Sequence, residues 1–406
     1  MINENLIFFH YLVSFISLVI LTRSLVKDSR SFFLNYITYL LGFGVLYFSL
    51  PSIITLTTME SPVEALPETI NFTAYIGLYF NVVFLFAYIY SLKKNQINTK
   101  DYKYKNIKLN TLVLMFGLFI FFFVIVLLVL NSPKIISIYG HRRLQADLDQ
   151  YFNSVFKVYF ISIIQIMITG FLFLTSKKKK YLLLYLPFIL YGFVLSDRDF
   201  IFKGAIFIAA SYSLTGLKIK LKYIVAFLTG LVLIGVARSY SLNNPRSLII
   251  ASYEFLFTWS TTHLIVESPE SSDLLSSIIY SISKASFPGT YQFFFGEYRH
   301  YHEVITKNNP LIAGLAGSVV SETLSFKNNF VTFFAPIIIS FYGLFLNKFL
   351  KYNFLFTKIL FIISILFIHS IIRFTFLEYA FYPVFIMIFF GFWIFNIDLK
   401  NKKHVL

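Results

Sequence analysis

The chain is a series of apolar runs of about 20 residues separated by polar breaks, and this pattern constrains its fold most. A bilayer hydrocarbon core is about 30 Å thick, and roughly 20 apolar residues in a helix are needed to cross it. The runs are continuous and do not alternate in polarity, which favours helices over the strands of a barrel. With 57% hydrophobic and 13% charged residues, the chain is predicted to be an all-α polytopic integral membrane protein.

About eleven transmembrane helices are predicted, in a single transmembrane domain that covers residues 1–406. The first run has no basic leader and no small-residue cleavage site, so we interpret it as a retained span. Ser247–Glu267 and Leu274–Phe287 are interpreted as amphipathic helices at the outer interface, and counting both as spans gives an alternative of thirteen. The eleven predicted spans are 6–26, 32–56, 70–92, 109–130, 151–175, 181–195, 200–217, 223–237, 328–347, 354–373 and 379–396.

Basic residues fall on alternate breaks, which predicts the orientation of the chain. One set of breaks, the lysine-rich breaks, holds 22 of the 35 lysines and arginines. The lysine-poor breaks between them hold most of the acids, and they include a large loop over 238–327. The assignment predicts the N-terminus out and the C-terminus in. The lysine-rich breaks are 23–31, 93–108, 177–180, 218–222, 348–358 and 400–403, and the lysine-poor breaks are 57–69, 131–150, 196–199, 238–327 and 374–378.

Arginine does not follow the distribution of lysine. Only Arg23 and Arg30 occur in the lysine-rich breaks, whereas seven of the other 13 basic residues are arginines. The planar guanidinium binds phosphate and carboxylate groups through two hydrogen bonds, so this bias indicates an anionic ligand on the outer side. The alternative, arginines that simply snorkel at helix ends, stays open. The seven are Arg142, Arg143, Arg198, Arg238, Arg246, Arg299 and Arg373.

Arg198 and Arg238 are predicted at the outer ends of adjacent spans, where both could bind one diphosphate. Arg198 belongs to the polar stretch Ser196–Asp199, in which Asp199 is expected to pair with Lys203 one helical turn further on. A diphosphate leaving group is stabilised by preorganised guanidinium groups.

The segment Tyr291–Glu303 combines aromatic, imidazole, carboxylate and guanidinium side chains, a mixture that suits a sugar with apolar faces and polar edges. His300 and His302 could share one face of a strand, but no third ligand has suitable spacing, so no metal site is predicted. The candidate sugar-binding residues are Trp259, Tyr291, Tyr298, Arg299 and Tyr301.

Glu322 follows a glycine-bearing stretch just before a predicted span. Desolvation there would raise its proton affinity and make it a candidate general base, although a structural pairing with an arginine is an equal alternative. His369 and Arg373, four residues apart, form a similarly ambiguous pair. The sequence contains no nucleotide-binding glycine loop and no cysteine, so no cofactor is predicted; the lysine distribution argues against nucleic acid as a partner.

The order of these features resembles that of the O-antigen polymerases, the Wzy-type oligosaccharide repeat-unit polymerases. The matching residues are Ser196-Asp197-Arg198, Arg238-Ser239-Tyr240, and Ser318–Glu322 with Asn328-Asn329-Phe330. The resemblance covers roughly residues 190–345. It is a resemblance in the pattern of these features.

The resemblance implies a membrane glycosyltransferase in the bacterial cytoplasmic membrane. It would join undecaprenyl-diphosphate-linked oligosaccharides, as donor and acceptor, into O-antigen or capsular polysaccharide on the periplasmic face. Arg198 and Arg238 would bind the diphosphate with support from Arg246, and Glu322, His300 or His302 would be the base. Membrane lipid and a chain-length regulator protein are the other expected partners. A lipid-linked oligosaccharide flippase and an O-antigen ligase remain the alternatives.

Overall fold

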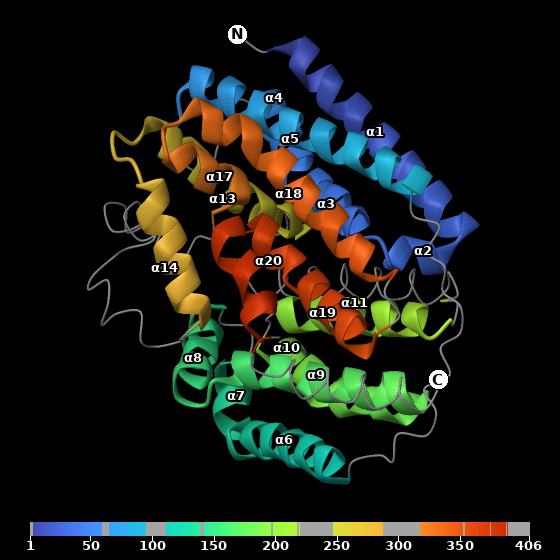
Figure 1. Cartoon of the computed structure of the whole chain (residues 1–406). Coiled ribbons are helices and arrows are strands. Elements are labelled where there is room, and N and C mark those ends of the chain that lie inside the picture. The colour runs from blue at the N-terminus through green and yellow to red at the C-terminus, as the bar shows by residue number, and fades with distance from the viewer. Residues whose placement is uncertain are drawn as a thin grey trace. The chain divides into compact units, whose positions relative to one another are not determined.

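The computed structural model describes residues 3–58, 65–94, 111–138, 142–195, 198–216, 219, 247–286, 317–351, 354–373, 375–386 and 388. Every regular element in these ranges is a helix (Figure 1). Seven of them are long and apolar enough to cross a membrane, so the chain has the make-up of a helical membrane protein. These seven are Glu4–Lys27, Tyr36–Thr58, Pro67–Lys93, Thr111–Leu130, Val158–Ser176, Asn329–Phe349 and Leu355–Arg373.

The chain divides into two compact units, whereas the sequence predicts one domain. Unit 1 comprises Met1–Ile97, Ser252–Phe349 and Phe367–Gly391. At its centre the long helix α5 packs against α1, α3, α4 and α18. Its elements are α1 (Glu4–Lys27), α2 (Ser29–Phe33), α3 (Tyr36–Gly44), the π-helix η1 (Val45–Ser49), α4 (Leu50–Thr58), α5 (Pro67–Lys94), most of α13 (Ser247–Glu267), α14 (Leu274–Ser286), α17 (Val319–Ser325), α18 (Asn329–Phe349), α20 (Ile368–Arg373) and the helix Phe376–Ile386.

Unit 2 comprises Asn98–Ala251, Leu350–Leu366 and Phe392–Leu406. Within it α9 packs against α6, α11 and α19. Its described elements are α6 (Thr111–Leu130), α7 (Ser132–Ile138), α8 (Arg142–Val155), α9 (Val158–Ser176), the 3₁₀-helix η2 (Lys179–Tyr185), α10 (Leu186–Val194), α11 (Arg198–Leu214) and α19 (Leu355–Leu366).

Two predicted spans of unit 2 have different boundaries in the structure. The span predicted at 151–175 begins only at Val158, because α8 continues to Val155 and Lys157 takes a left-handed backbone conformation that separates the two helices. The span predicted at 181–195 is a 3₁₀ turn followed by the short helix α10, which starts with Pro187 in its first turn. The span predicted at 223–237 lies outside the described residues.

The segment Thr258–His263 of helix α13 is buried in unit 1, whereas the sequence predicts a helix on the outer interface. All six side chains from Thr258 to His263 are buried. The Trp259 indole lies against Gly77 of α5, where an added Cβ atom would come within 2.7 Å of the ring, and its ring centre is 6.0 Å from that of Phe48. The polar residues of this segment therefore contribute to the interior of the unit.

Hydrogen bonds bring the lysine-poor breaks of unit 1 together at one end. Glu267 Oε1 accepts the Leu66 N–H (2.8 Å), and Ser325 O accepts the Ser272 N–H (2.8 Å). Lys327 Nζ donates to the carbonyl oxygen of Ile265 (2.6 Å), in the last turn of α13. The loops before α5, after α13 and before α18 thus meet, and we call this the lysine-poor end.

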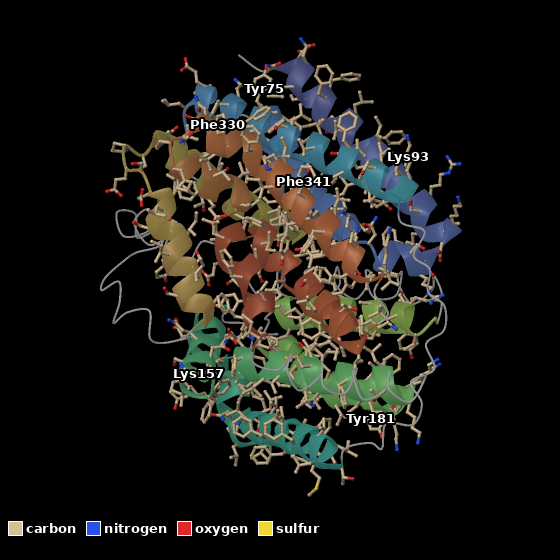
Figure 2. All side chains as sticks on the ribbon, viewed as in Figure 1. Tyr75, Lys93, Lys157, Tyr181, Phe330 and Phe341 are labelled. Atoms are coloured by element: carbon tan, nitrogen blue, oxygen red, sulfur yellow. The ribbon has the colours of Figure 1, made fainter. Side chains whose placement is uncertain are left out.

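The other end of unit 1 joins three segments that lie in or beside lysine-rich breaks. Asn35 Nδ2 donates to Ser91 Oγ (2.7 Å), and Asn347 Nδ2 donates to Asn35 Oδ1 (2.7 Å). Along α5, Tyr75 and Lys93 lie towards opposite ends of the helix (Figure 2). Each end of unit 1 therefore joins segments from breaks of one kind.

Candidate functional site

The short helix α17 lies at the centre of a buried polar cluster at the lysine-poor end. Its N-terminus is closed by a reciprocal cap in which Ser318 Oγ accepts the Ser321 N–H (3.1 Å) and Ser321 Oγ accepts the Ser318 N–H (3.2 Å). The hydroxyl of Thr262 on α13 lies 2.7 Å from Ser321 Oγ. These bonds fix α17 against α13 and determine where the next residue, Glu322, can reach.

Glu322 is 3% exposed and binds the start of another helix. Its Oε2 accepts the N–H of Phe376 (2.6 Å) and its Oε1 accepts the N–H of Leu377 (3.4 Å). These are the first two residues of the helix Phe376–Ile386, and Thr375 Oγ1 accepts the next N–H, that of Glu378 (3.3 Å). Glu322 is thus a helix cap supplied from a distant part of the chain.

Burial raises the pKa of Glu322 to about 8, with a smaller contribution from the charge of Glu378. The two N–H bonds act in the opposite direction, because they favour the ionised carboxylate, but burial outweighs them. Both oxygens of this carboxyl group already accept backbone N–H groups. The arrangement suits a positioning role better than that of a general base.

An ion pair links the same helix to α14. Lys284 Nζ lies 2.9 Å from Glu378 Oε1, and the Lys284 side chain is 28% exposed while that of Glu378 is 8% exposed. Lys284, Glu378, Thr375 and Glu322 therefore form one continuous set of contacts from α14 to α17. Sequence reasoning missed Lys284 and Glu378, although the Thr375-x-x-Glu378 spacing is a recognisable helix-start signal.

A second polar cluster lies in unit 2 around the beginning of α11. Lys203 is 1% exposed; its ammonium donates to the Tyr159 hydroxyl and lies 3.8 Å from the centre of that ring. The Tyr191 hydroxyl of α10 donates to Asp149 of α8 (2.7 Å). These contacts hold α8 and α10 together just before the segment that carries Arg198.

The predicted site residues are only partly covered by the structure. Arg198 is the first residue of α11, and its side chain, like that of Asp199, is outside the described part. Trp259 is fully buried and presents no ring face to a sugar, which removes the observation behind its predicted role. Arg238, Arg246, Tyr291, Tyr298, Arg299, His300, Tyr301 and His302 all lie outside the described residues.

His369 and Arg373 belong to α20, and the structure gives the histidine a partner. The ring atom Nε2 of His369 lies 2.8 Å from the hydroxyl of Tyr47, a residue of the π-helix η1. The side chains of His369 and Tyr47 are buried in unit 1, and the Tyr47 ring also packs on Phe255 of α13. Within the described ranges, no group of three or more His, Asp or Glu residues is placed to hold a metal ion.

These features define a helical membrane protein with a charged, buried cluster at one end of its first unit. No family model, no curated protein and no solved structure matches the chain.

Proposed function

We propose that the protein is a membrane glycosyltransferase that joins lipid-diphosphate-linked oligosaccharides into a polysaccharide on the outer side of a bacterial cytoplasmic membrane. The observation that carries the proposal is the separation of arginine from lysine: seven of nine arginines lie away from the lysine-rich breaks. Retention of loops in the cytoplasm needs only positive charge, so this separation calls for another reason. Recognition of a diphosphate is such a reason.

In this proposal Arg198 and Arg238 bind the lipid diphosphate, with Arg246 in support. A hydroxyl of the acceptor sugar attacks the anomeric carbon of the donor, the bond from that carbon to the diphosphate oxygen breaks, and the lipid diphosphate leaves. The guanidinium groups stabilise the negative charge that develops on the leaving oxygen. The hydroxyl proton goes to a base, for which His300 and His302 are the candidates.

The role of Glu322 in this proposal is to position another segment. Its two bonds to Phe376 and Leu377 fix residues that lie three and four positions after Arg373 in sequence. A buried carboxyl group at the lysine-poor end supports a site on the side of the membrane where the arginines are predicted. The sugar-binding role stays with Tyr291, Tyr298, Arg299 and Tyr301, since Trp259 is buried.

The test is the surface polysaccharide of cells that carry Arg198→Ala or Arg238→Ala in place of the native chain. Each variant is expected to lose long polysaccharide while its abundance in the membrane is unchanged, because the charge on the leaving group is no longer stabilised. Arg198→Lys should restore little, since lysine lacks the bidentate geometry. Arg23→Ala, in a lysine-rich break, is the matched control and should leave the polysaccharide unchanged. Normal chain length in both outer variants would contradict the proposal.

A deletion strain separates the related functions. Loss of a polymerase leaves single repeat units on the final acceptor, so a short, discrete product is the expected result. Accumulation of long polymer on the lipid carrier would identify a ligase instead. Absence of both products outside the cell, with lipid-linked single units retained inside, would identify a flippase.

A further inference from the structure

Helix α14 has its polar and apolar sides reversed relative to a helix on the surface of a water-soluble protein. The side that packs into unit 1 carries Ser277 (8% exposed), Ser281 (1%) and Tyr280 (3%). The opposite side presents Leu275 (65% exposed) and Ile279 (41%). The spacing of both sets is helical, so one face is serine-lined and inward and the other is aliphatic and outward.

The outward face has the same character as the lipid-type surfaces elsewhere in unit 1. Phe15 of α1 is 67% exposed and Phe341 of α18 is 67% exposed, and both helices are candidate spans. An aliphatic face of α14 in water would carry a free-energy cost that grows with its apolar area. The medium that covers α1 and α18 is therefore the occupant that suits α14 as well.

The length of α14 decides how it can meet the membrane. It has 13 residues, which gives a length of about 20 Å, shorter than the roughly 30 Å of a hydrocarbon core. It lies at the edge of unit 1 (Figure 1), and the bond from Ser272 N–H to Ser325 O places its beginning at the lysine-poor end. At its other end the Lys284–Glu378 ion pair joins it to the helix that Glu322 caps.

We propose that α14 lies between the membrane and the polar lysine-poor end of unit 1. The face formed by Leu275, Ile279 and Ile282 contacts lipid chains. The hydrocarbon tail of a lipid-linked substrate lies along this face, and its polar headgroup lies at the lysine-poor end, where α14 begins. The part of this proposal that concerns substrate rests on the proposed function. The part that concerns lipid does not.

The absence of cysteine from the chain makes a direct test simple, because single cysteines can be labelled without background. Ile279→Cys is labelled with a nitroxide, the protein is placed in phosphatidylethanolamine–phosphatidylglycerol vesicles, and collisions with oxygen and with a water-soluble nickel chelate are compared. We expect oxygen to dominate, as for the control Phe15→Cys on α1. Glu270→Cys in the exposed turn is the control for water, and Ser281→Cys is the control for protein burial.

A nickel-dominated signal at position 279 would overturn the proposal by placing the face in water. Protection from both quenchers, as at position 281, would overturn it by showing that protein covers the face. For the substrate part, the Ile279→Cys variant carries a benzophenone label and is irradiated in vesicles that contain radiolabelled C55 polyprenyl diphosphate. Capture several-fold greater than in the equally labelled Phe15→Cys variant is expected, and equal capture would overturn this part alone. If cells with Arg198→Ala still make long polysaccharide, that result contradicts the proposed function but not the lipid contact of α14.

Discussion

The two ends of unit 1 are held together by different chemistry. At the end beside the lysine-rich breaks, Asn35, Ser91 and Asn347 form a neutral network, and Asn347 Oδ1 also accepts the Tyr36 N–H (2.8 Å). At the lysine-poor end, and in the Lys284–Glu378 pair at the far end of α14, the partners are charged or titratable; Glu322 is the titratable group of the first set. The neutral network accounts for the joining of helices at its end, whereas buried ionisable groups are costly and cluster at functional sites more often than elsewhere.

The largest effect is expected from Glu322→Ala, which removes the buried acceptor of two part-buried N–H groups. Leaving the N–H groups of Phe376 and Leu377 without a partner should lower the free energy of unfolding by about 3 kcal/mol. The measurement is reversible unfolding in mixed detergent micelles, followed by circular dichroism. Glu267→Ala is the matched control, because Glu267 also accepts one backbone N–H but is exposed; water can replace it, so the loss should be below about 0.5 kcal/mol. Equal losses in the two variants would refute the assignment of Glu322 as a buried cap.

Asn347→Ala tests the neutral end in the same assay. The substitution removes the acceptor of the Tyr36 N–H and the donor to Asn35 Oδ1, and the loss should be about 2 kcal/mol. Because no ionisable group takes part, the loss should be the same at pH 5 and at pH 8. A loss that changes with pH would show that the two ends are coupled and would break the comparison.

The pH dependence of stability should come from the charged end. The pKa of Glu322 is raised from 4.5 to about 8 in the folded protein, so the folded state holds a proton that the unfolded state has released between these values. The contribution of Glu322 to the free energy of unfolding is therefore complete below about pH 4.5 and is lost as the pH rises to about 8. The slope is at most about 1.4 kcal/mol per pH unit. Unfolding measured across this range should show a reduced slope in Glu322→Gln and an unchanged slope in Asn347→Ala. A Gln variant with the native slope would assign the titration to another group.

The long apolar runs could be predicted from sequence because length and composition suffice: α1, α6 and α18 all lie where such runs occur. Their boundaries depend on single backbone features that composition does not reveal, such as the left-handed Lys157. The burial of α13 was not predictable, since a run of serine, threonine and histidine also suits a water-facing surface. The hydroxyl of Thr262 on α13, for example, contacts that of Ser321, which lies 59 residues further along the chain.

The contacts of the candidate site were even less predictable from the sequence. The position of Glu322 before a span marked it as unusual, and in the structure burial raises its pKa. Its partners are backbone N–H groups 54 and 55 residues further on, and backbone groups leave no signature in the sequence. The arginine distribution, by contrast, can be read directly from the chain and needs no tertiary contact to be noticed.

The smallest effect concerns the ion pair that joins α14 to the rest of the lysine-poor end. Lys284 is partly exposed, so solvent weakens its attraction to Glu378, and a coupling of about 0.5–1 kcal/mol is expected. The coupling is obtained from a double-mutant cycle of Lys284→Met and Glu378→Gln, measured by unfolding in micelles. It should fall further when salt is raised, whereas the loss in Asn347→Ala should not. A coupling near zero at low salt would show that the ion pair does not help to attach α14 to the helix Phe376–Ile386, and the polar contact of that helix with the cluster would then rest on Glu322 of α17.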